Sequence, residues 1–209
     1  MSDQVIAIDG PAGSGKSSVA RAHASALGWS FLDTGAMYRA VTVEALQRGV
    51  DVSDADATGA IAEGVTLTTL PRVTVDGRDV EDEIRTDEVN VAVSIVAANP
   101  LVRAQMVRRQ RDFAAAQPLG TVVEGRDITT VVFPHATVKI FLTASLQERA
   151  RRRGDESEAS VARRDDADST REASPLRQAS DALVLDTTGR TVNDVVEEII
   201  GCLKLKTSS

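Results

Sequence analysis

Short runs of aliphatic residues alternate along the chain with longer segments in which apolar residues recur every three or four positions. The aliphatic runs predict five buried strands, at Val5–Ile8, Ser30–Leu32, Thr121–Val123, Val138–Leu142 and Ala182–Leu185. Since helical patterns lie between most of these strands, we expect an α/β protein with a parallel sheet covered by helices on both faces.

The helical segments have the spacing of amphipathic helices. They are Ser17–Leu27, Ala36–Arg48, Asn90–Ala98, Leu101–Ala116 and a last helix from Thr191 to about Leu203. The first two stop at Gly28 and Gly49, where glycine allows the left-handed backbone of a C-terminal cap.

Residues 64–80 break this rhythm. Polar and apolar residues alternate there at period 2 around an Asp76-Gly77 turn signal, which predicts a small antiparallel insertion. The 209-residue length fits one compact domain. We expect its core at residues 1–35 and 117–209 and its insertion at about 36–116. The polar, arginine-rich stretch at 153–172 reads by itself as a solvated loop.

Composition narrows the class of protein. Aromatic residues make up 3% of the chain and hydrophobic residues 42%, so aliphatic side chains must build the core, as in parallel sheets. A net charge of −7 argues against a general nucleic-acid or anionic-membrane binder. The sequence contains no apolar run of 18 residues and no signal-type segment, so we expect a cytoplasmic protein without a membrane partner.

The segment GPAGSGKS follows an apolar strand, opens a helix and matches the P-loop pattern. Its glycines let backbone N–H groups turn toward phosphate oxygens, Lys16 can reach the β- and γ-phosphates, and the Ser17 hydroxyl can ligate Mg²⁺. The helix N-terminus adds its positive dipole end. The expected nucleotide-binding residues are Gly10, Pro11, Ala12, Gly13, Ser14, Gly15, Lys16, Ser17 and Ser18.

The rest of the chain favours a kinase among P-loop proteins. A guanine-reading Asn-Lys-x-Asp motif is missing. The segment DTTG at 186–189 lies about 170 residues after the P-loop and is interpreted as a strand end and turn rather than a GTPase switch. Thr34, Tyr38 and Arg39 follow the second predicted strand, and Arg126 and Asp127 the third, at the sheet edge where ligands bind. Taken alone, Thr34 could equally cap a helix and Tyr38 could be a core residue. Arg126 and Asp127 could equally form a structural salt bridge.

Seven segments taken together resemble bacterial cytidylate kinase, a P-loop nucleoside monophosphate kinase, in order and over nearly the whole chain. They are GPAGSGKS, LDTGAMYRA, VDGRDVEDEIRTDEV, VSIVAANPLVRAQMVRRQR, VVEGRDITTVVFP, VKIFLTAS and RRDDADSTREASPL. The resemblance implies a three-layer P-loop NTPase fold with five parallel strands, an acceptor-binding insertion with a small antiparallel sheet, and a lid at about 150–170. It implies transfer of the γ-phosphate of ATP to CMP or dCMP with Mg²⁺, in pyrimidine nucleotide metabolism.

The resemblance also implies roles for individual residues. The CMP-binding residues would be Ser94, Arg103 and Asp127 at the cytosine, Thr34, Tyr38, Arg39 and Arg126 at the sugar and phosphate, and Arg164, Asp168 and Arg171 near the sugar and the transfer site. Catalysis would rest on alignment and positive charge rather than on a general base. Its residues would be Lys16, Arg126, Arg164 and Arg171. Arg164 and Asp168 could instead form a charge pair on an exposed helix.

The resemblance also implies residues for the base of the lid and for the metal site. One of the arginines Arg149, Arg152 and Arg153 would contact the donor phosphates, and we expect Arg152 to be this ATP ligand. Asp33 would order a water on Mg²⁺, or alternatively stabilise the start of a helix.

Two departures from the family stand out. Thr129 occupies a position where we expect glycine, which could shift the backbone beside the acceptor pocket. The lid is short, with ten residues between the segments RARRR and RDDAD, so we hypothesise leakage of ATP to water.

Two alternatives stay open. One is a P-loop kinase of another small acceptor such as UMP, and the other is a non-catalytic nucleotide-binding regulator. The regulator is disfavoured because it has no need for Arg39, Arg126, Arg164 and Arg171 together. A monomer is expected.

Overall fold

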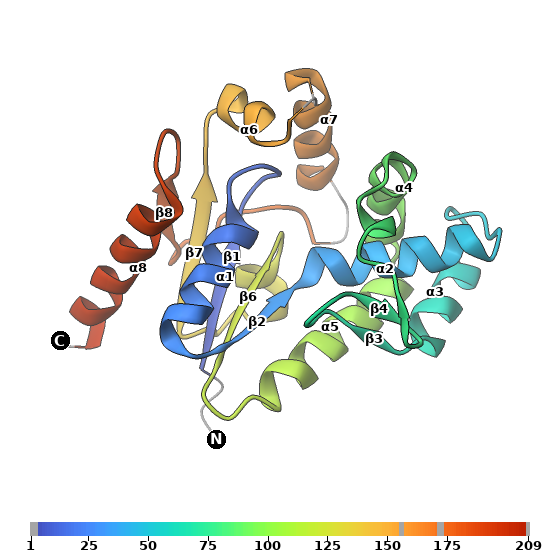
Figure 1. Ribbon diagram of the computed structural model, residues 1–209, viewed down its shortest axis with the longest axis horizontal. Coiled ribbons are helices and arrows are strands. Elements are labelled where there is room, and N and C mark those ends of the chain that lie inside the picture. Colours follow the sequence, from blue (N-terminus) through green and yellow to red (C-terminus); the bar gives the residue numbers. More distant parts are fainter. Residues whose placement is uncertain (1–3, 155–156, 171–173, 208–209) are drawn as a thin grey trace. The chain divides into compact units, whose positions relative to one another are not determined.

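The computed structural model describes residues 4–154, 157–170 and 174–207, apart from the side chains of Arg164 and of residues 203–207 (Figure 1). One compact unit consists of Met1–Leu32 and Ala114–Ser209, and the other of Asp33–Phe113. Within the described residues, no helix combines the length and the apolar character needed to cross a membrane.

A five-stranded parallel sheet forms the centre of the first unit, and the predicted fold class is confirmed. Its strands lie in the order β2-β6-β1-β7-β8. The strands are β1 (Val5–Asp9), β2 (Ser30–Asp33), β6 (Thr121–Gly125), β7 (Val138–Thr143) and β8 (Leu183–Asp186). Every residue of β1 and β6 is buried, as the continuous aliphatic runs predict for central strands of a parallel sheet.

Helices α1 (Lys16–Leu27) and α8 (Val192–Thr207) were both predicted, and they pack against each other and the sheet. Their buried aliphatic side chains share one core with the strands. The core residues of these two helices are Val19, Ala20, Ala24, Val195, Val196 and Ile199. Gly28 has the predicted left-handed cap conformation after α1, with φ 66°.

The interpretation of residues 153–172 as a solvated loop is wrong for most of the described part of that stretch. Helix α6 (Leu146–Arg152) ends just before it, and α7 (Glu158–Ser169) lies within it. Helix α7 has almost no apolar stripe to reveal it, since Val161 is its one fully buried apolar residue among the described positions. Its start is instead fixed by Ser157, whose side chain accepts a hydrogen bond from the Ser160 N–H.

The second unit contains the predicted antiparallel insertion. Strands β3 (Leu67–Thr68), β4 (Thr74–Val75) and β5 (Arg78–Asp79) pair antiparallel, with a left-handed Asp76-Gly77 turn between the last two. The helical elements are α2 (Thr34–Gln47), α3 (Ala55–Gly64), the short η1 (Glu83–Arg85), α4 (Asp87–Ala98) and α5 (Pro100–Ala115). Helix α3 was not predicted, and Asp54 caps its start by accepting from the Ala57 N–H.

The register of the sheet brings the strand ends to one edge. Asp9, the last residue of β1, pairs with Gly125 of β6 and with Phe141 of β7. At the end of β7, Thr143 pairs with Asp186 of β8. The segments that follow these four strands therefore leave from the same edge of the sheet, which is where ligands of open parallel sheets bind.

Candidate nucleotide-binding and phosphoryl-transfer site

The loop between β1 and α1 depends on its glycines. Gly10, Gly13 and Gly15 all have positive φ angles. A Cβ atom on Gly10 would lie 2.1 Å from the carbonyl oxygen of Leu142, and one on Gly13 would lie 2.8 Å from that of Arg149. Both backbone conformation and close packing therefore require glycine at these two positions. The loop leads directly into the N-terminus of α1, as in P-loops that hold phosphates.

Lys16 is buried at the first position of α1, with 5% of its surface exposed. Its Nζ donates a hydrogen bond to the Pro11 carbonyl oxygen at 2.8 Å. Burial, and then the nearby charge of Arg126, lower the pKa of Lys16 from 10.5 to about 7. The positive charge of this lysine is thus costly without an anion beside it, and a bound phosphate would favour the charged form.

A buried carboxylate faces the next residue of the loop. The Ser17 hydroxyl donates to Oε1 of Glu124 at 2.6 Å, and Glu124 is 4% exposed on β6. The sequence analysis missed Glu124, although an acid at the end of a strand beside the P-loop strand was the available signal. Asp33, by contrast, caps α2 by accepting a hydrogen bond from the Ala36 N–H at 2.9 Å.

Asp9 is a second buried carboxylate that the sequence analysis missed. It accepts hydrogen bonds from the Ile128 N–H at 2.9 Å and from the Thr129 N–H and hydroxyl, each at 2.7 Å. Burial raises the pKa of Asp9 against the lowering effect of these hydrogen bonds. Asp9 thus ties the strand before the P-loop to the segment that follows Arg126 and Asp127.

The same contacts explain how the chain accommodates Thr129. Its side chain is buried and its hydroxyl is used by Asp9. Within the described residues, only Asp76 and Ser174 combine a side chain with a positive φ, so Thr129 does not strain its backbone. The threonine adds a hydrogen bond to a buried carboxylate instead of disturbing the segment.

Arg126 and Asp168 form an ion pair, with Nε of Arg126 donating to Oδ2 of Asp168 at 2.6 Å. Burial acts to lower the pKa of Arg126. The pKa is nevertheless raised overall, by the charge of Asp168 and its hydrogen bond with Arg126, and then by the charges of Glu124 and Asp9. Asp127 is 4% exposed at the end of the same segment. Arg164 lies in α7, but its side chain is outside the described part of the chain, and so is the whole of Arg171.

The second unit brings together two of the predicted residues. The guanidinium of Arg103, on α5, lies 5.6 Å from the ring centroid of Tyr38, on α2, and both residues are buried. NH1 of Arg103 also donates to the Ala97 carbonyl oxygen at 3.2 Å. Such a cation–π contact with a backbone hydrogen bond fixes the orientation of the arginine.

Three further predicted residues lie on the helices of this unit. Thr34 is buried at the first position of α2, and Ser94 is half-buried on α4. NH1 of Arg39 donates to the Ile84 carbonyl oxygen and to Oδ1 of Asn90, each at 2.8 Å. Arg39 therefore links α2 to η1 and α4.

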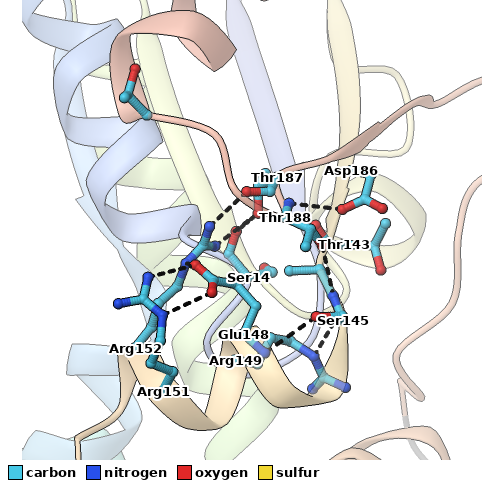
Figure 2. A network of polar contacts seen from close by, with 12 residues as sticks. Ser14, Thr143, Ser145, Glu148, Arg149, Arg151, Arg152, Asp186, Thr187 and Thr188 are labelled. Carbon is cyan, nitrogen blue, oxygen red and sulfur yellow. Dashed lines mark hydrogen bonds and ion pairs between the residues drawn. The ribbon is translucent and has the colours of Figure 1, made fainter.

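The arginines at the base of the lid have different surroundings (Figure 2). Arg149 donates to the carbonyl oxygens of Ala144 and Ala12 and pairs with Asp165, so its contacts are structural. Arg152 lies beside the phosphate loop, since its NH1 is 3.5 Å from where a Cβ on Gly15 would stand. Of these two, Arg152 is the better placed to meet a phosphate.

A five-stranded parallel sheet of this order, with a phosphate loop after its central strand, defines the P-loop NTPase fold. The gluconokinase from Sinorhizobium meliloti 1021 has a similar fold, with a TM-score of 0.51 and 15% identity over 94% of this chain and 89% of that one.

The sequence comparisons define the family. The sequence model of the cytidylate kinase family matches residues 6–205, and the chain belongs to that family of phosphotransferases. It is 49% identical over 214 residues to a cytidylate kinase from Mycobacterium avium (strain 104), covering 94% of this chain and 93% of the relative. It is also 49% identical over 212 residues to one from Geobacillus kaustophilus (strain HTA426), covering 93% and 94%.

Proposed function

We propose that the protein transfers the γ-phosphate of ATP to CMP or dCMP, giving CDP or dCDP and ADP. The observation that carries this proposal is the match to cytidylate kinases along nearly the whole chain. The phosphate loop by itself would not suffice, because proteins of many functions share it. What distinguishes a kinase of this type is a second set of cationic and polar residues for the acceptor.

The donor binds at the phosphate loop. The loop from Gly10 to Ser18 surrounds the phosphates with the backbone N–H groups of its residues other than Pro11, and Lys16 and Arg152 supply positive charge. The lowered pKa of Lys16 supports this role, since an anion at the loop relieves the cost of its buried charge.

Mg²⁺ fits beside Ser17 and Glu124. Magnesium takes few protein ligands and otherwise binds phosphate oxygens and water, so a hydroxyl and one buried carboxylate are a suitable set. We propose Ser17 as the direct ligand and Glu124, in preference to Asp33, as the carboxylate that orders a metal-bound water. The capping hydrogen bond at the start of α2 gives Asp33 another role. When bound, the ion neutralises charge on the transferring phosphate.

The residues that bind the acceptor are proposed from the family resemblance. By the family resemblance, Arg126 with Thr34, Tyr38 and Arg39 binds its phosphate and sugar. The same resemblance assigns Arg164, Asp168 and Arg171 to the sugar and the transfer site. Since Arg126 is paired with Asp168, a phosphate bound to this guanidinium would compete with that pair and leave the Asp168 carboxylate available to ribose hydroxyls.

Asp127, Arg103 and Ser94 are proposed to read the base. Cytosine presents an N4 amino donor, which the Asp127 carboxylate can accept, and N3 and O2 acceptors, to which Arg103 can donate. Uracil places its O4 acceptor against the carboxylate and leaves buried groups unpaired. One such loss costs about 1 to 3 kcal/mol, so this edge favours CMP over UMP by about fivefold to more than a hundredfold.

The transfer step requires alignment rather than a general base. An oxygen of the acceptor phosphate attacks the γ-phosphorus, the bond to the bridging oxygen of the β-phosphate breaks, and ADP leaves. Lys16, Arg126 and the lid arginines Arg164 and Arg171 carry positive charge that can meet the charge developing on the transferring group.

Product analysis tests this function. Purified protein is incubated with ATP, Mg²⁺ and CMP, and nucleotides are separated by anion-exchange chromatography. We expect CDP together with at least an equal amount of ADP, both lost in Lys16→Met. ADP without CDP would mean that ATP is hydrolysed and not used to phosphorylate CMP, and tight ATP binding without any turnover would support a regulator. We also propose that the protein is cytoplasmic and monomeric. Sedimentation velocity tests whether it is a monomer.

A further inference from the structure

The turn that follows β8 contacts the phosphate loop, although its DTTG sequence was interpreted only as a strand end and turn (Figure 2). This segment, residues 186–189, is called the β8 turn below. Its two threonines differ in their surroundings. Thr187 is 2% exposed, whereas Thr188 is exposed and its hydroxyl accepts a hydrogen bond from the Ser145 N–H.

The Thr187 hydroxyl oxygen lies between three elements. It is 3.0 Å from the carbonyl oxygen of Ser14 in the phosphate loop and 3.1 Å from that of Thr143 at the end of β7. It also accepts a hydrogen bond from NH1 of Arg152 at 2.8 Å. A hydroxyl has one proton and two lone pairs, so it can donate to one carbonyl while it accepts from the arginine. One oxygen thus connects the loop, β7 and α6.

Arg152 is held from two sides. Its NH2 group donates to the Thr187 carbonyl oxygen at 2.6 Å, and its Nε donates to Oε1 of Glu148 at 2.9 Å. Hydrogen bonds from Arg151 and then Arg152 lower the pKa of Glu148 to about 2, so this carboxylate is charged at physiological pH. Three of the five N–H groups of a guanidinium are used in this way, and NH1 and NH2 each keep one more.

We propose that Thr187 is a positioning residue for the donor phosphates. Its hydroxyl and carbonyl hold the Arg152 guanidinium beside Gly15, and the same hydroxyl supports the backbone of Ser14 within the phosphate loop. The inference rests on the proposed ATP site. In it, the β8 turn fixes the position of Arg152 relative to the phosphate loop. Arg152 touches the phosphate, and Thr187 acts through it.

The test compares Thr187→Val with Thr187→Ser and Thr188→Val. Valine keeps the shape of threonine and removes the hydrogen bonds of the hydroxyl, while the backbone carbonyl can still accept from Arg152. Serine restores the hydroxyl, and Thr188→Val makes the same chemical change one position away. Affinity for ADP with Mg²⁺ is measured by calorimetry, and KM values for ATP and CMP by steady-state kinetics. Thermal unfolding checks that each variant folds, and Thr187→Ala replaces Thr187→Val if the valine variant does not.

We expect Thr187→Val to weaken ADP binding and to raise KM for ATP by about tenfold or more, with KM for CMP changed less than about twofold. Thr187→Ser should recover most of this loss, and Thr188→Val should stay within about twofold of the unmodified protein. In an Arg152→Ala background the effect of Thr187→Val should largely disappear, because the two residues act as one unit.

Three results would overturn the inference. They are unchanged ADP affinity in folded Thr187→Val, equal losses for ATP and CMP, and full additivity with Arg152→Ala. Because ADP binding requires no acceptor, it decides the role of Thr187 even if the chain fails to phosphorylate CMP. Failure of the proposed function would appear instead as missing CDP with ADP affinity intact.

Discussion

Nucleotide binding should take up a proton at pH 8, because Lys16 is buried beside the phosphate loop. Its pKa is lowered to about 7, so most molecules carry a neutral Lys16 at pH 8. A polyphosphate next to Nζ favours the charged amine and returns its pKa toward 10.5. The expected uptake is therefore a large fraction of one proton per nucleotide bound.

Calorimetry in two buffers measures this uptake. ADP with Mg²⁺ is titrated into the protein at pH 8 in Tris and in HEPES, whose ionisation enthalpies differ, and the observed enthalpies give the number of protons. Phosphate groups with a second pKa of about 6 are already ionised at pH 8, so the nucleotide contributes little. Lys16→Arg is the matched control, since a guanidinium stays charged in both states and the uptake should vanish.

The sign of the effect is fixed by the lowered pKa. Between pH 7 and pH 10.5 the folded protein binds fewer protons at Lys16 than the unfolded chain, so this group makes the fold more stable as pH rises. Nucleotide binding removes that difference by restoring the proton. An uptake close to zero in the unmodified protein would refute the reasoning, and an equal uptake in Lys16→Arg would assign the proton to another group.

Three further outcomes follow from the geometry of the first unit. Gly13→Ala should weaken ADP binding by about tenfold or more, because φ is 77° and the new Cβ would lie 2.8 Å from the Arg149 carbonyl oxygen; an unchanged dissociation constant contradicts this. Thr129→Val removes a hydrogen bond to buried Asp9 and should lower the free energy of unfolding in urea by about 1 to 3 kcal/mol, with Thr129→Ser recovering most of it; equal stability of the two variants would count against that contact. The short lid should allow measurable ADP release from ATP without acceptor, and hydrolysis negligible beside transfer would remove that hypothesis.

The parts of the fold that repeat a local pattern were predictable from the sequence. Continuous aliphatic runs gave all five strands of the parallel sheet, and the Asp76-Gly77 signal marked the antiparallel insertion. Helix α7 was missed because its charged sequence has almost no apolar stripe, and a single Ser157 cap is a weak signal. Patterns of burial reveal a helix only where one face is buried.

The candidate site was predictable only in part, because much of it depends on contacts between distant residues. The glycines and Lys16 are adjacent in sequence and form a recognisable motif. Glu124 lies 107 positions from its partner Ser17, and Thr187 lies 173 positions from Ser14. A buried acid or threonine looks ordinary in sequence until the fold supplies its partner. The same holds for Asp9, whose three donors come from the segment after β6.

The most direct test of the account compares kcat/KM for CMP and UMP, with ADP release followed in the presence of ATP and Mg²⁺. We predict that CMP is favoured by about fivefold to more than a hundredfold, and that Asp127→Ala reduces this preference. Equal values for CMP and UMP, or ADP release that does not depend on the acceptor, would contradict the assignment of this protein as a kinase of CMP.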